Sequence, residues 1–379
     1  MKKFGRRLFW MLVGSIFFLA GLSVPAFSAG NKPAFRKGEL IVKYKSEEKK
    51  LRSVGAHERL RPRTLKQFKR FNLELVEVDP TVSMEEALAA YNSDPAVEYA
   101  EPNYEMVAVD LTPTDDDFYR LWGLHNTGQS GGIPDADIDA PAAWELTTGS
   151  IDVVIAVIDT GIDYTHEDLA ANMWINDAEL NGTSGVDDDG NGYVDDIYGI
   201  DTYHHDADPR DDHFHGTHCA GTIGAVGSNS IGVAGVNWDV QLMACKFLGP
   251  RGSGWTSGAL ECLEYIGDMK DRGVDVVTTS NSWGCGGNCY SQALSDAIEN
   301  HIDADILFVA AAGNSNSDTD IYDFYPANYY LPNLLSIAAT DHNDNRAFFS
   351  NYGRRKVHIG APGLNVYSTE PRDNYGYRS

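Results

Sequence analysis

Cysteine and positive charge are both scarce in this sequence of 379 residues, and each shortage excludes a class of protein. Five cysteines are too few for a disulfide framework in so long a chain, and their odd number leaves at least one thiol unpaired within it. Cys285 and Cys289 enclose two glycines, so they either close a small loop disulfide or remain buried thiols. The formal net charge of -25 repels nucleic acid and anionic membranes, so we expect no nucleic-acid partner and favour cations as ligands.

Long apolar runs are also missing, except at the start of the chain. Lysines and arginines precede an apolar stretch at residues 8–22, and small residues follow at 25–29. This order predicts a secretory signal peptide at residues 1–29 and a secreted protein with no membrane partner after cleavage. An uncleaved N-terminal anchor is the alternative, since the run is almost long enough to span a bilayer.

The residues after this leader divide into two parts by charge and pattern. Lysines and arginines crowd the first half of residues 30–110, which makes that half basic, whereas the chain after residue 110 is strongly acidic. Apolar periodicity in residues 30–110 predicts strands at 39–44, 73–78 and 98–103 and one helix at 84–91. Ser83 is placed to cap the helix, and a proline at position 102 is expected to end the last strand. We therefore expect a small α+β domain whose positive charge suits it to an acidic partner in the same chain.

Residues 111–379 have a different pattern, in which continuous apolar runs alternate with amphipathic segments. The runs predict buried parallel strands at 153–158, 241–247, 274–280, 306–312 and 334–339, with helices at 254–272 and 291–302. This alternation predicts an α/β fold with a doubly wound, mostly parallel sheet. The functional groups of such a sheet collect at the carboxyl ends of its strands.

Three polar residues stand where this fold would place functional groups. Asp159 ends a strand in Asp-Thr-Gly, His215 opens a small-residue helix in His-Gly-Thr-His, and Asn314 ends a strand in Ala-Ala-Gly-Asn. The helix N-terminus is expected to lower the pKa of the His215 imidazole and keep it ready to act as a base. The carboxamide of Asn314 can donate a hydrogen bond to an oxyanion. The carboxylate of Asp159 is a structural, catalytic or metal-binding group. Taken alone, a Gly-Asn pair is more commonly a turn.

In this order the three motifs resemble those of the subtilisin-like serine peptidases, and the resemblance covers residues 122–379. It implies a serine endopeptidase in which Asp159 orients and stabilises the imidazole, His215 is the general base and Asn314 serves the oxyanion. It also implies that the nucleophilic serine follows a Gly-Tyr turn within Ser-Gly-Thr-Ser-Met-Ala. This sequence ends at Ser379, so the resemblance places the nucleophile three residues later, and we expect a polypeptide of these residues alone to be inactive.

The resemblance further implies two walls of a groove in which a polypeptide substrate lies as an additional strand. The matching residues are Gly252, Ser253 and Gly254 on one wall and Ser282, Trp283 and Gly284 on the other. Their small side chains let a peptide backbone approach closely. Apart from the resemblance, Gly-Ser-Gly is commonly a plain loop, and Trp283 is almost as readily a core residue as a pocket residue.

An acidic loop at residues 187–196 predicts a Ca2+ site. Oxygen-bearing side chains alternate around glycines as in the first half of an EF-hand loop, but Tyr198 stands where that loop has its glutamate. The predicted ligands are the side chains of Asp187, Asp189, Asn191 and Asp196 and the carbonyl of Tyr193, with Asp195 as a substitute for Asp196. A solvated acidic turn is the alternative. The resemblance alone implies a second calcium site, with Asp168 and Asn229 as ligands.

The segment at residues 30–110 resembles the inhibitory propeptides of the same peptidases, above all at 99–103. It is therefore expected to be a folding chaperone and intramolecular inhibitor of a catalytic domain at 111–379, released by cleavage near residues 108–117. Two alternatives stay open. The first alternative is a zinc enzyme, because five histidines between positions 204 and 218 lie among carboxylates. The second alternative is a non-catalytic, secreted, calcium-binding pseudopeptidase.

Overall fold

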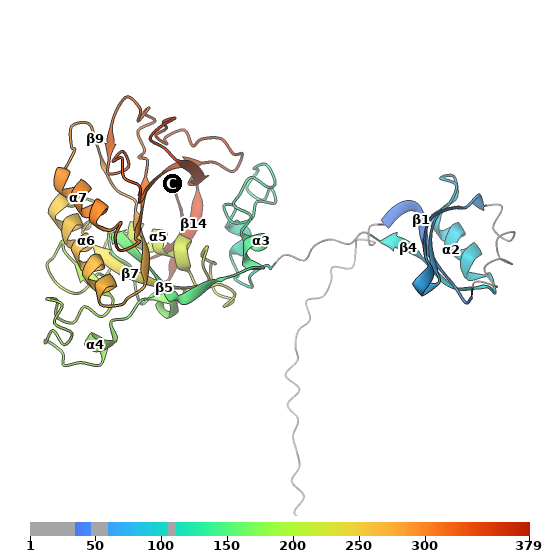
Figure 1. Ribbon diagram of the computed structural model, residues 1–379, viewed down its shortest axis with the longest axis horizontal. Coiled ribbons are helices and arrows are strands. Elements are labelled where there is room, and N and C mark those ends of the chain that lie inside the picture. Colours follow the sequence, from blue (N-terminus) through green and yellow to red (C-terminus); the bar gives the residue numbers. More distant parts are fainter. Residues whose placement is uncertain (1–34, 47–59, 105–110) are drawn as a thin grey trace, which may run out of the picture. The chain divides into compact units, whose positions relative to one another are not determined.

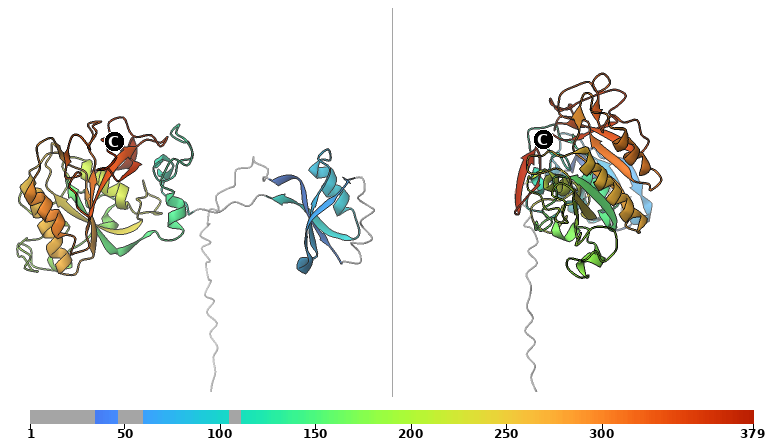
Figure 2. Two further views of the ribbon diagram at one scale, coloured as in Figure 1. Left: turned by 45° about the horizontal axis from the view of Figure 1, so that its top comes forward. Right: turned by 90° about the vertical axis from the view of Figure 1, so that its left-hand side faces the viewer.

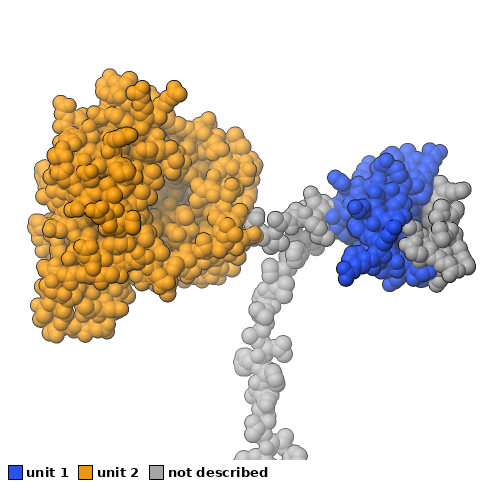
Figure 3. Space-filling model, viewed as in Figure 1, with its two compact units in different colours: residues 1–109 blue, residues 110–379 orange. Residues whose placement is uncertain are grey.

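The computed structural model describes residues 35–46, 60–104 and 111–379. Its contacts divide the chain into two compact units, residues 1–109 and 110–379 (Figure 3). The predicted signal peptide at residues 1–29 lies outside the described residues, and the domain boundaries at 30–110 and 111–379 remain predictions. In the described part of the chain, no helix has both the length and the apolar character needed to cross a membrane.

The first unit contains a four-stranded antiparallel sheet with helix α2 packed on it (Figure 1). In the order β2-β3-β1-β4 the strands are Arg63–Phe68, Leu73–Glu77, Phe35–Tyr44 and Val97–Tyr104. Helix α2 (Met84–Asn92) begins after Ser83, whose side chain accepts a hydrogen bond from the Glu86 amide. Sequence analysis missed β2 because its residues are all exposed. It also ended the last strand too early, since β4 continues beyond Pro102, which pairs with Leu40.

The second unit contains the predicted doubly wound sheet, in the order β13-β12-β10-β8-β5-β7-β6. The strands are β5 (Gly149–Asp159), β6 (Gly199–Asp201), β7 (Asp239–Lys246), β8 (Val276–Asn281), β10 (Leu307–Ala311), β12 (Leu334–Thr340) and β13 (Ile359–Pro362). Every pair of neighbouring strands is parallel. After β5 the chain forms the edge strand β6, returns to β7 beside β5, and then crosses to β8 on the other side, from which it continues outward to β13. The crossing from β7 to β8 places the switch in strand order beside the end of β5.

Helices cover both faces of this sheet because side chains alternate along β5. Val154, Ala156 and Ile158 pack in one core with helices α6 (Thr256–Asp271) and α7 (Gln292–Asn300), which lie side by side in Figures 1 and 2. Val157 packs in the other core with helix α5 (His215–Gly224). The shorter helices are α3 (Ala140–Trp144) and α4 (Asp177–Leu180).

Two small antiparallel pairs lie outside the main sheet. Strand β9 (Cys285–Gly286) pairs with β11 (Phe324–Tyr325), and β14 (Val366–Glu370) pairs with β15 (Asn374–Arg378).

The cysteines form two disulfides. One disulfide joins Cys245 in β7 to Cys262 in α6, and the other closes the loop between Cys285 and Cys289. Cys219 in α5 remains free.

Candidate active site

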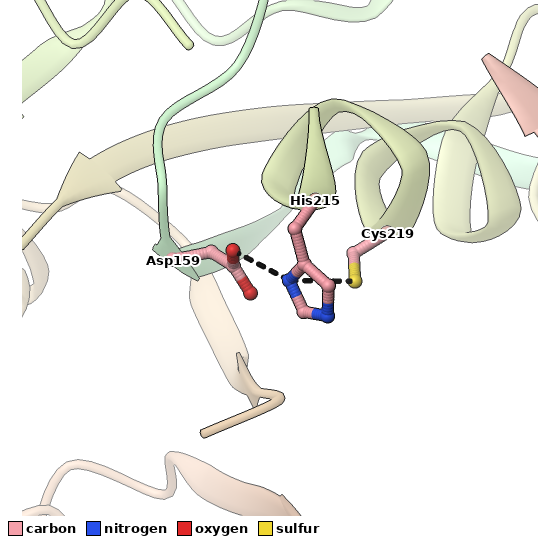
Figure 4. Close-up of side chains that lie close together, drawn as sticks. All are labelled: Asp159, His215 and Cys219. Carbon is pink, nitrogen blue, oxygen red and sulfur yellow. Dashed lines mark hydrogen bonds and ion pairs between the residues drawn. The ribbon is translucent and has the colours of Figure 1, made fainter. Parts of the chain in front are cut away.

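Asp159 and His215 meet where the last residue of β5 faces the first residue of α5 (Figure 4). The Nδ1–H of His215 donates a hydrogen bond to Oδ1 of Asp159 at 2.8 Å. Gly216 permits this approach, since a Cβ at that position would lie 2.1 Å from the carbonyl oxygen of Gly161. The glycine of the His-Gly-Thr-His motif is therefore required by close packing of the helix against the β5 turn.

The environments of the two side chains suit them to different tasks. Asp159 is 1% exposed, and the Thr160 amide also donates to it at 2.7 Å. The side chain of His215 is 38% exposed. Because Nδ1 carries the donated proton, Nε2 keeps a free lone pair, and Figure 4 shows that nitrogen directed away from Asp159. An imidazole held in this tautomer can take a proton from a third group.

Neighbouring groups raise the pKa of His215, which is opposite to the lowering expected from the helix N-terminus. The largest cause is the Coulombic attraction of Cys219, whose sulfur lies 4.0 Å from Nδ1, and the hydrogen bond that His215 donates to Asp159 acts in the same direction. Burial opposes both. The attraction of Cys219 needs an ionised thiol, so Asp159 is the partner that stabilises the imidazolium whenever the sulfur is neutral.

His218 lies one helical turn further along α5 and has a structural role. Its Nε2–H donates to the carbonyl oxygens of Val366 and Gly376, each at 3.2 Å, and so ties α5 to both strands of the β14–β15 pair. Burial lowers the pKa of His218 to about 4. The pKa values of the two histidines of the motif therefore shift in opposite directions, and burial keeps His218 neutral.

A buried network, which sequence analysis missed, fixes the start of α5. Asp211 accepts hydrogen bonds from the hydroxyl of Thr160 and from both the amide and the hydroxyl of Thr217. In the same network, the side chain of Lys246 is 1% exposed, and its ammonium donates hydrogen bonds to Asp212 and to the carbonyl oxygen of Thr160. Only Thr217 is near Asp211 in the sequence, and the partners Thr160 and Lys246 lie tens of positions away, so no local sequence signal marks the network.

Asn314 lies after the end of β10 in the same cleft as His215. Asn351, which is 1% exposed, fixes this turn: it donates to the carbonyl oxygen of Ala312 and accepts from the amides of Ser315 and Ser317. The Asn314 side chain is thereby presented to solvent by a turn that is anchored on both sides.

The cleft has a volume of about 550 Å³ and lies beside the carboxyl ends of β8 and β10. Its lining includes all six predicted wall residues, namely Gly252, Ser253, Gly254, Ser282, Trp283 and Gly284. Trp283 also contacts the core, since its ring packs edge-on against Phe247 and Phe308. The geometry therefore brings the candidate base, the candidate oxyanion donor and both candidate walls together.

A second, smaller groove of about 330 Å³ adjoins His215 and Asn314. Small residues of β10 and β12 line it, and Arg378 and Ser379 lie at it as well. The end of strand β15 therefore lies at the groove that His215 and Asn314 also line.

Three carboxylates meet at the acidic loop, and one of them was not predicted. Oxygen atoms of Glu179, Asp189 and Asp196 lie within 4.8 Å of one another, and Asn191 donates to both aspartates. Asp196 is fully buried, and burial, together with the charges of Asp189 and Glu179, raises its pKa to about 6. A buried group of oxygen donors with like charges fits a Ca2+ ion. Glu179, at the end of α4, takes the place of the glutamate that the loop itself lacks.

Asp187 lies differently from the other predicted side-chain ligands, whereas the carbonyl of Tyr193 stays a predicted ligand. Both carboxylate oxygens of Asp187 accept hydrogen bonds from loop amides, those of Gly190, Asn191 and Gly192, and these lower its pKa. The hydroxyl of Tyr193 donates to Glu261 on α6. Asp187 lies outside the cluster of three carboxylates, whereas Glu179 belongs to it and also accepts hydrogen bonds from the amides of Asp188, Asp189 and Asp195.

Asp168 and Asn229 also come together, as the resemblance implies. Asn229 donates to Asp168 at 2.8 Å, and burial, with a contribution from Asp115, raises the pKa of Asp168 to about 6. Asp115 is the residue that sequence analysis missed here: it is 5% exposed, and its Oδ1 has no hydrogen-bond partner among the described residues. An orphaned buried carboxylate oxygen beside a second carboxylate fits a cation.

The zinc alternative finds no support in the arrangement of the histidines. Within residues 35–46, 60–104 and 111–379, two groups of three potential metal ligands occur, and neither contains more than one histidine. His204 pairs with Asp201 at 2.7 Å instead.

Comparison with known families matches both units. Residues 150–378 match the model of the subtilase family of peptidases, and residues 23–103 match the fervidolysin N-terminal prodomain.

Individual relatives agree with these matches. The thermophilic serine proteinase of Bacillus sp. (strain AK1) is 34% identical over 92% of this chain and 75% of its own length. Subtilisin-like protease 1 of Plasmodium berghei is 36% identical over 61% of this chain, and this chain spans only 40% of it. Among solved structures, a protease from Pseudoalteromonas arctica superimposes with a TM-score of 0.54 and 27% identity, over 71% of this chain and 82% of that one.

Proposed function

This chain belongs to the subtilase family, and we propose that it belongs to a secreted serine endopeptidase precursor that hydrolyses peptide bonds through an Asp-His-Ser triad. The observation that carries the proposal is the hydrogen bond between His215 and Asp159 in a cleft that also contains Asn314. The family resemblance places the serine three residues after Ser379. The proximity of Ser379 to His215 and Asn314 across the smaller groove supports that placement.

Each group has one task in this mechanism. His215 Nε2 takes the proton from the serine hydroxyl as its oxygen attacks the substrate carbonyl carbon, and Asp159 stabilises the imidazolium that forms. The Asn314 carboxamide donates to the negative oxygen of the tetrahedral intermediate. The imidazolium then gives its proton to the leaving amine, and water repeats the sequence to release the acyl group.

The substrates are polypeptides that can adopt an extended backbone. Such a segment lies between the wall at residues 252–254 and the wall at 282–284, where glycines leave room for main-chain hydrogen bonds. Folded segments cannot present a free strand, so loose regions of proteins are the expected targets.

Calcium is proposed as a structural ligand at two places. Glu179, Asp189, Asn191 and Asp196 form one site, and Asp115, Asp168 and Asn229 form the other. At each place the ion would neutralise buried carboxylates. Neither place belongs to the catalytic steps.

The first unit is proposed as a propeptide that assists folding and inhibits the second unit until it is released. Its match to a prodomain supports this role, as do the lysines and arginines crowded into residues 32–70 of a chain whose second unit is strongly acidic. An N-terminal signal peptide would deliver the precursor to the outside of the cell.

The test begins with the coding sequence after codon 379. We expect Gly-Thr-Ser followed by a small-residue helix, and we expect the product of that longer sequence to turn over a chromogenic peptide. The polypeptide of residues 1–379 is the matched control and should show no turnover. A stop codon directly after Ser379 favours the calcium-binding pseudopeptidase, and turnover by residues 1–379 contradicts the proposed nucleophile.

A further inference from the structure

The hairpin of strands β14 and β15 is fastened on one side to helix α5, which carries the general base. His218 of α5 donates to the carbonyl oxygen of Gly376 on β15. In return, the buried hydroxyl of Ser368 donates to the carbonyl oxygen of His218 at 2.9 Å, and that of Thr369 to the carbonyl oxygen of Thr217 at 2.8 Å. The hairpin is therefore fixed against the helix that carries the base.

On its other side the hairpin contacts the calcium site proposed at Asp168 and Asn229, and Tyr375 of β15 makes this contact. The Tyr375 hydroxyl lies 3.3 Å from Oδ2 of Asp168 and 3.4 Å from Oε1 of Glu167, and it donates to this pair of carboxylates. The other oxygen of Asp168 accepts a hydrogen bond from Asn229. Tyr375 is thus hydrogen-bonded directly to a proposed calcium ligand.

The ring of Tyr375 is also packed against the second segment of that site. A Cβ added to Gly232 would lie 2.1 Å from Cζ of the ring and 2.3 Å from its hydroxyl oxygen, whereas carbon atoms in contact are about 3.5–4.0 Å apart. Gly232 lies between Asn229 and Val233, whose amide donates to Asp168 at 2.9 Å. The ring therefore touches both segments that supply the proposed ligands Asp168 and Asn229.

Backbone contacts reinforce this attachment. The Asp168 amide donates to Nδ1 of the fully buried His166, so the Nε2–H of that ring donates to the carbonyl oxygen of Asn374 at 3.1 Å. The Glu167 amide donates to Asp373 at 2.8 Å. Residues 166–168 therefore each hold a different residue in or next to the start of β15.

The far end of β15 lies where the catalytic groups meet. Arg378 and Ser379 line the groove that His215 and Asn314 also line, and the family resemblance places the nucleophilic serine three residues after Ser379. A misplacement of a reacting group by about 1 Å can cost about a hundredfold in rate. The position of β15 therefore bears on catalysis.

We propose that Tyr375, through its hydroxyl, is a positioning residue that couples the calcium site at Asp168 to the nucleophilic serine. Calcium bound there fixes the Asp168 carboxylate, and Tyr375 passes this position along β15. Without the ion, the like charges of Asp115 and Asp168 repel each other and displace the partner of the hydroxyl. The inference rests on the proposed endopeptidase function and on the proposed calcium site.

The experiment measures coupling between two ligands by calorimetry in the cold, where autolysis is slow. One ligand is calcium, and the other is a peptide aldehyde that adds reversibly to the serine. The enzyme is the product of the complete coding sequence after release of its propeptide, with Glu179→Gln to weaken the other calcium site. We expect saturating calcium to tighten aldehyde binding by at least about fivefold, and the aldehyde to tighten calcium binding by the same factor, because coupling is reciprocal.

Three variants in this background assign the coupling. Tyr375→Phe keeps the ring and its packing, so it should still bind calcium, but the coupling factor should fall close to one. Tyr367→Phe is the matched control, since it removes a hydroxyl of the same hairpin that donates to Asp117, and it should keep the full factor. Asn229→Ala removes a proposed calcium ligand, so calcium should no longer affect aldehyde binding.

Three results overturn the inference while the peptidase function stands. The first is aldehyde binding that calcium does not change in the parent enzyme, the second is a Tyr375→Phe enzyme that keeps the full coupling factor, and the third is the absence of calcium binding at this site. Failure of the proposed function itself looks different: the aldehyde does not bind with or without calcium, and no serine reacts with a phosphonate probe.

Discussion

The substrate cleft and the acidic loops of the second unit both gather polar side chains, but they satisfy them in different ways. In the cleft, Asp159 and His215 are partners of each other, and a buried network around Asp211 holds the helix that carries the base. In the loops, buried carboxylates lie beside other carboxylates, and one oxygen of Asp115 has no partner among the described residues. Oδ2 of Asp159 also lacks a partner among the described residues, but the nearest charged group to Asp159 is a histidine, whereas the loop carboxylates face other carboxylates. This difference is the reason that we propose a cation only in the loops.

This difference separates what each region contributes. Changes at His215 or Asn314 should affect rate with little effect on stability, because both side chains lie at the surface of a cleft. Changes at the acidic loops should affect stability and calcium affinity, because their carboxylates are buried in the fold. The predictions below test this separation, beginning with the largest expected effect.

Replacing the base should have the largest effect. In the active longer product, His215→Ala is expected to lower kcat by about 10⁶, the loss found for the equivalent change in subtilisin, with little change in melting temperature. His218→Gln is the matched control in the same helix, and it should retain most of the activity. A His215→Ala enzyme that keeps more than a tenth of the wild-type rate contradicts the assignment.

Replacing the oxyanion donor should have a smaller effect of the same kind. Asn314→Ala is expected to lower kcat by about 10²–10³ and leave KM nearly unchanged, because the hydrogen bond forms in the transition state. Steady-state kinetics on one peptide measure both constants. An increase in KM alone would show that Asn314 binds substrate and does not serve the oxyanion.

Removing calcium should lower stability and leave the Asp159–His215 pair intact. A site saturated at 100 times its Kd contributes about 2.7 kcal/mol to the free energy of unfolding. Glu179→Gln should therefore weaken calcium binding, measured by calorimetry on chelator-treated protein, more than Asp187→Asn does, because Glu179 is buried within the cluster of three carboxylates and Asp187 lies outside it. The opposite order would favour the ligand set predicted from sequence.

The stability of the metal-free protein should depend on pH because of the buried carboxylates in the acidic loops. Asp168 and Asp196 have pKa values raised to about 6, so the folded state holds more protons than the unfolded state between about pH 4 and 6. Without calcium, these two groups should make stability fall as pH rises through that range. Saturating calcium should remove the fall, and chemical denaturation at pH 4.5 and 7 with and without calcium measures it.

The buried histidine should contribute a pH dependence of opposite sign. The pKa of His218 is lowered to about 4, so the unfolded state binds a proton first as the pH falls below about 6.5. The resulting loss of stability reaches at most about 3 kcal/mol by pH 4. The difference in unfolding free energy between wild type and His218→Gln, followed from pH 7 to 4, isolates this contribution. A constant difference would show that the pKa of His218 is the same in the folded and unfolded states.

The sequence predicted those features that depend on local pattern. The apolar runs that became β5, β7, β8, β10 and β12 were visible because strands buried on both faces are continuously apolar. The three motifs at Asp159, His215 and Asn314 were visible because each one joins a strand or helix end to a functional side chain.

Features that depend on distant contacts were missed. Glu179 and Asp115 join carboxylates that lie well separated from them in the chain, and neither residue stands in a recognisable ligand pattern. Strand β2 was missed because none of its residues is buried. The expected lowering of the His215 pKa considered only the helix N-terminus, whereas Cys219 and Asp159 act on the ring more strongly.

Reaction with a serine-directed fluorophosphonate, followed by peptide mapping with mass spectrometry, tests the central claim most directly. In the longer product, we predict that the probe attaches to the serine three residues after Ser379, and that His215→Ala sharply slows the attachment. We predict no labelling of the polypeptide of residues 1–379. Labelling at any serine within residues 1–379, or labelling at a rate that does not depend on His215, would contradict the account.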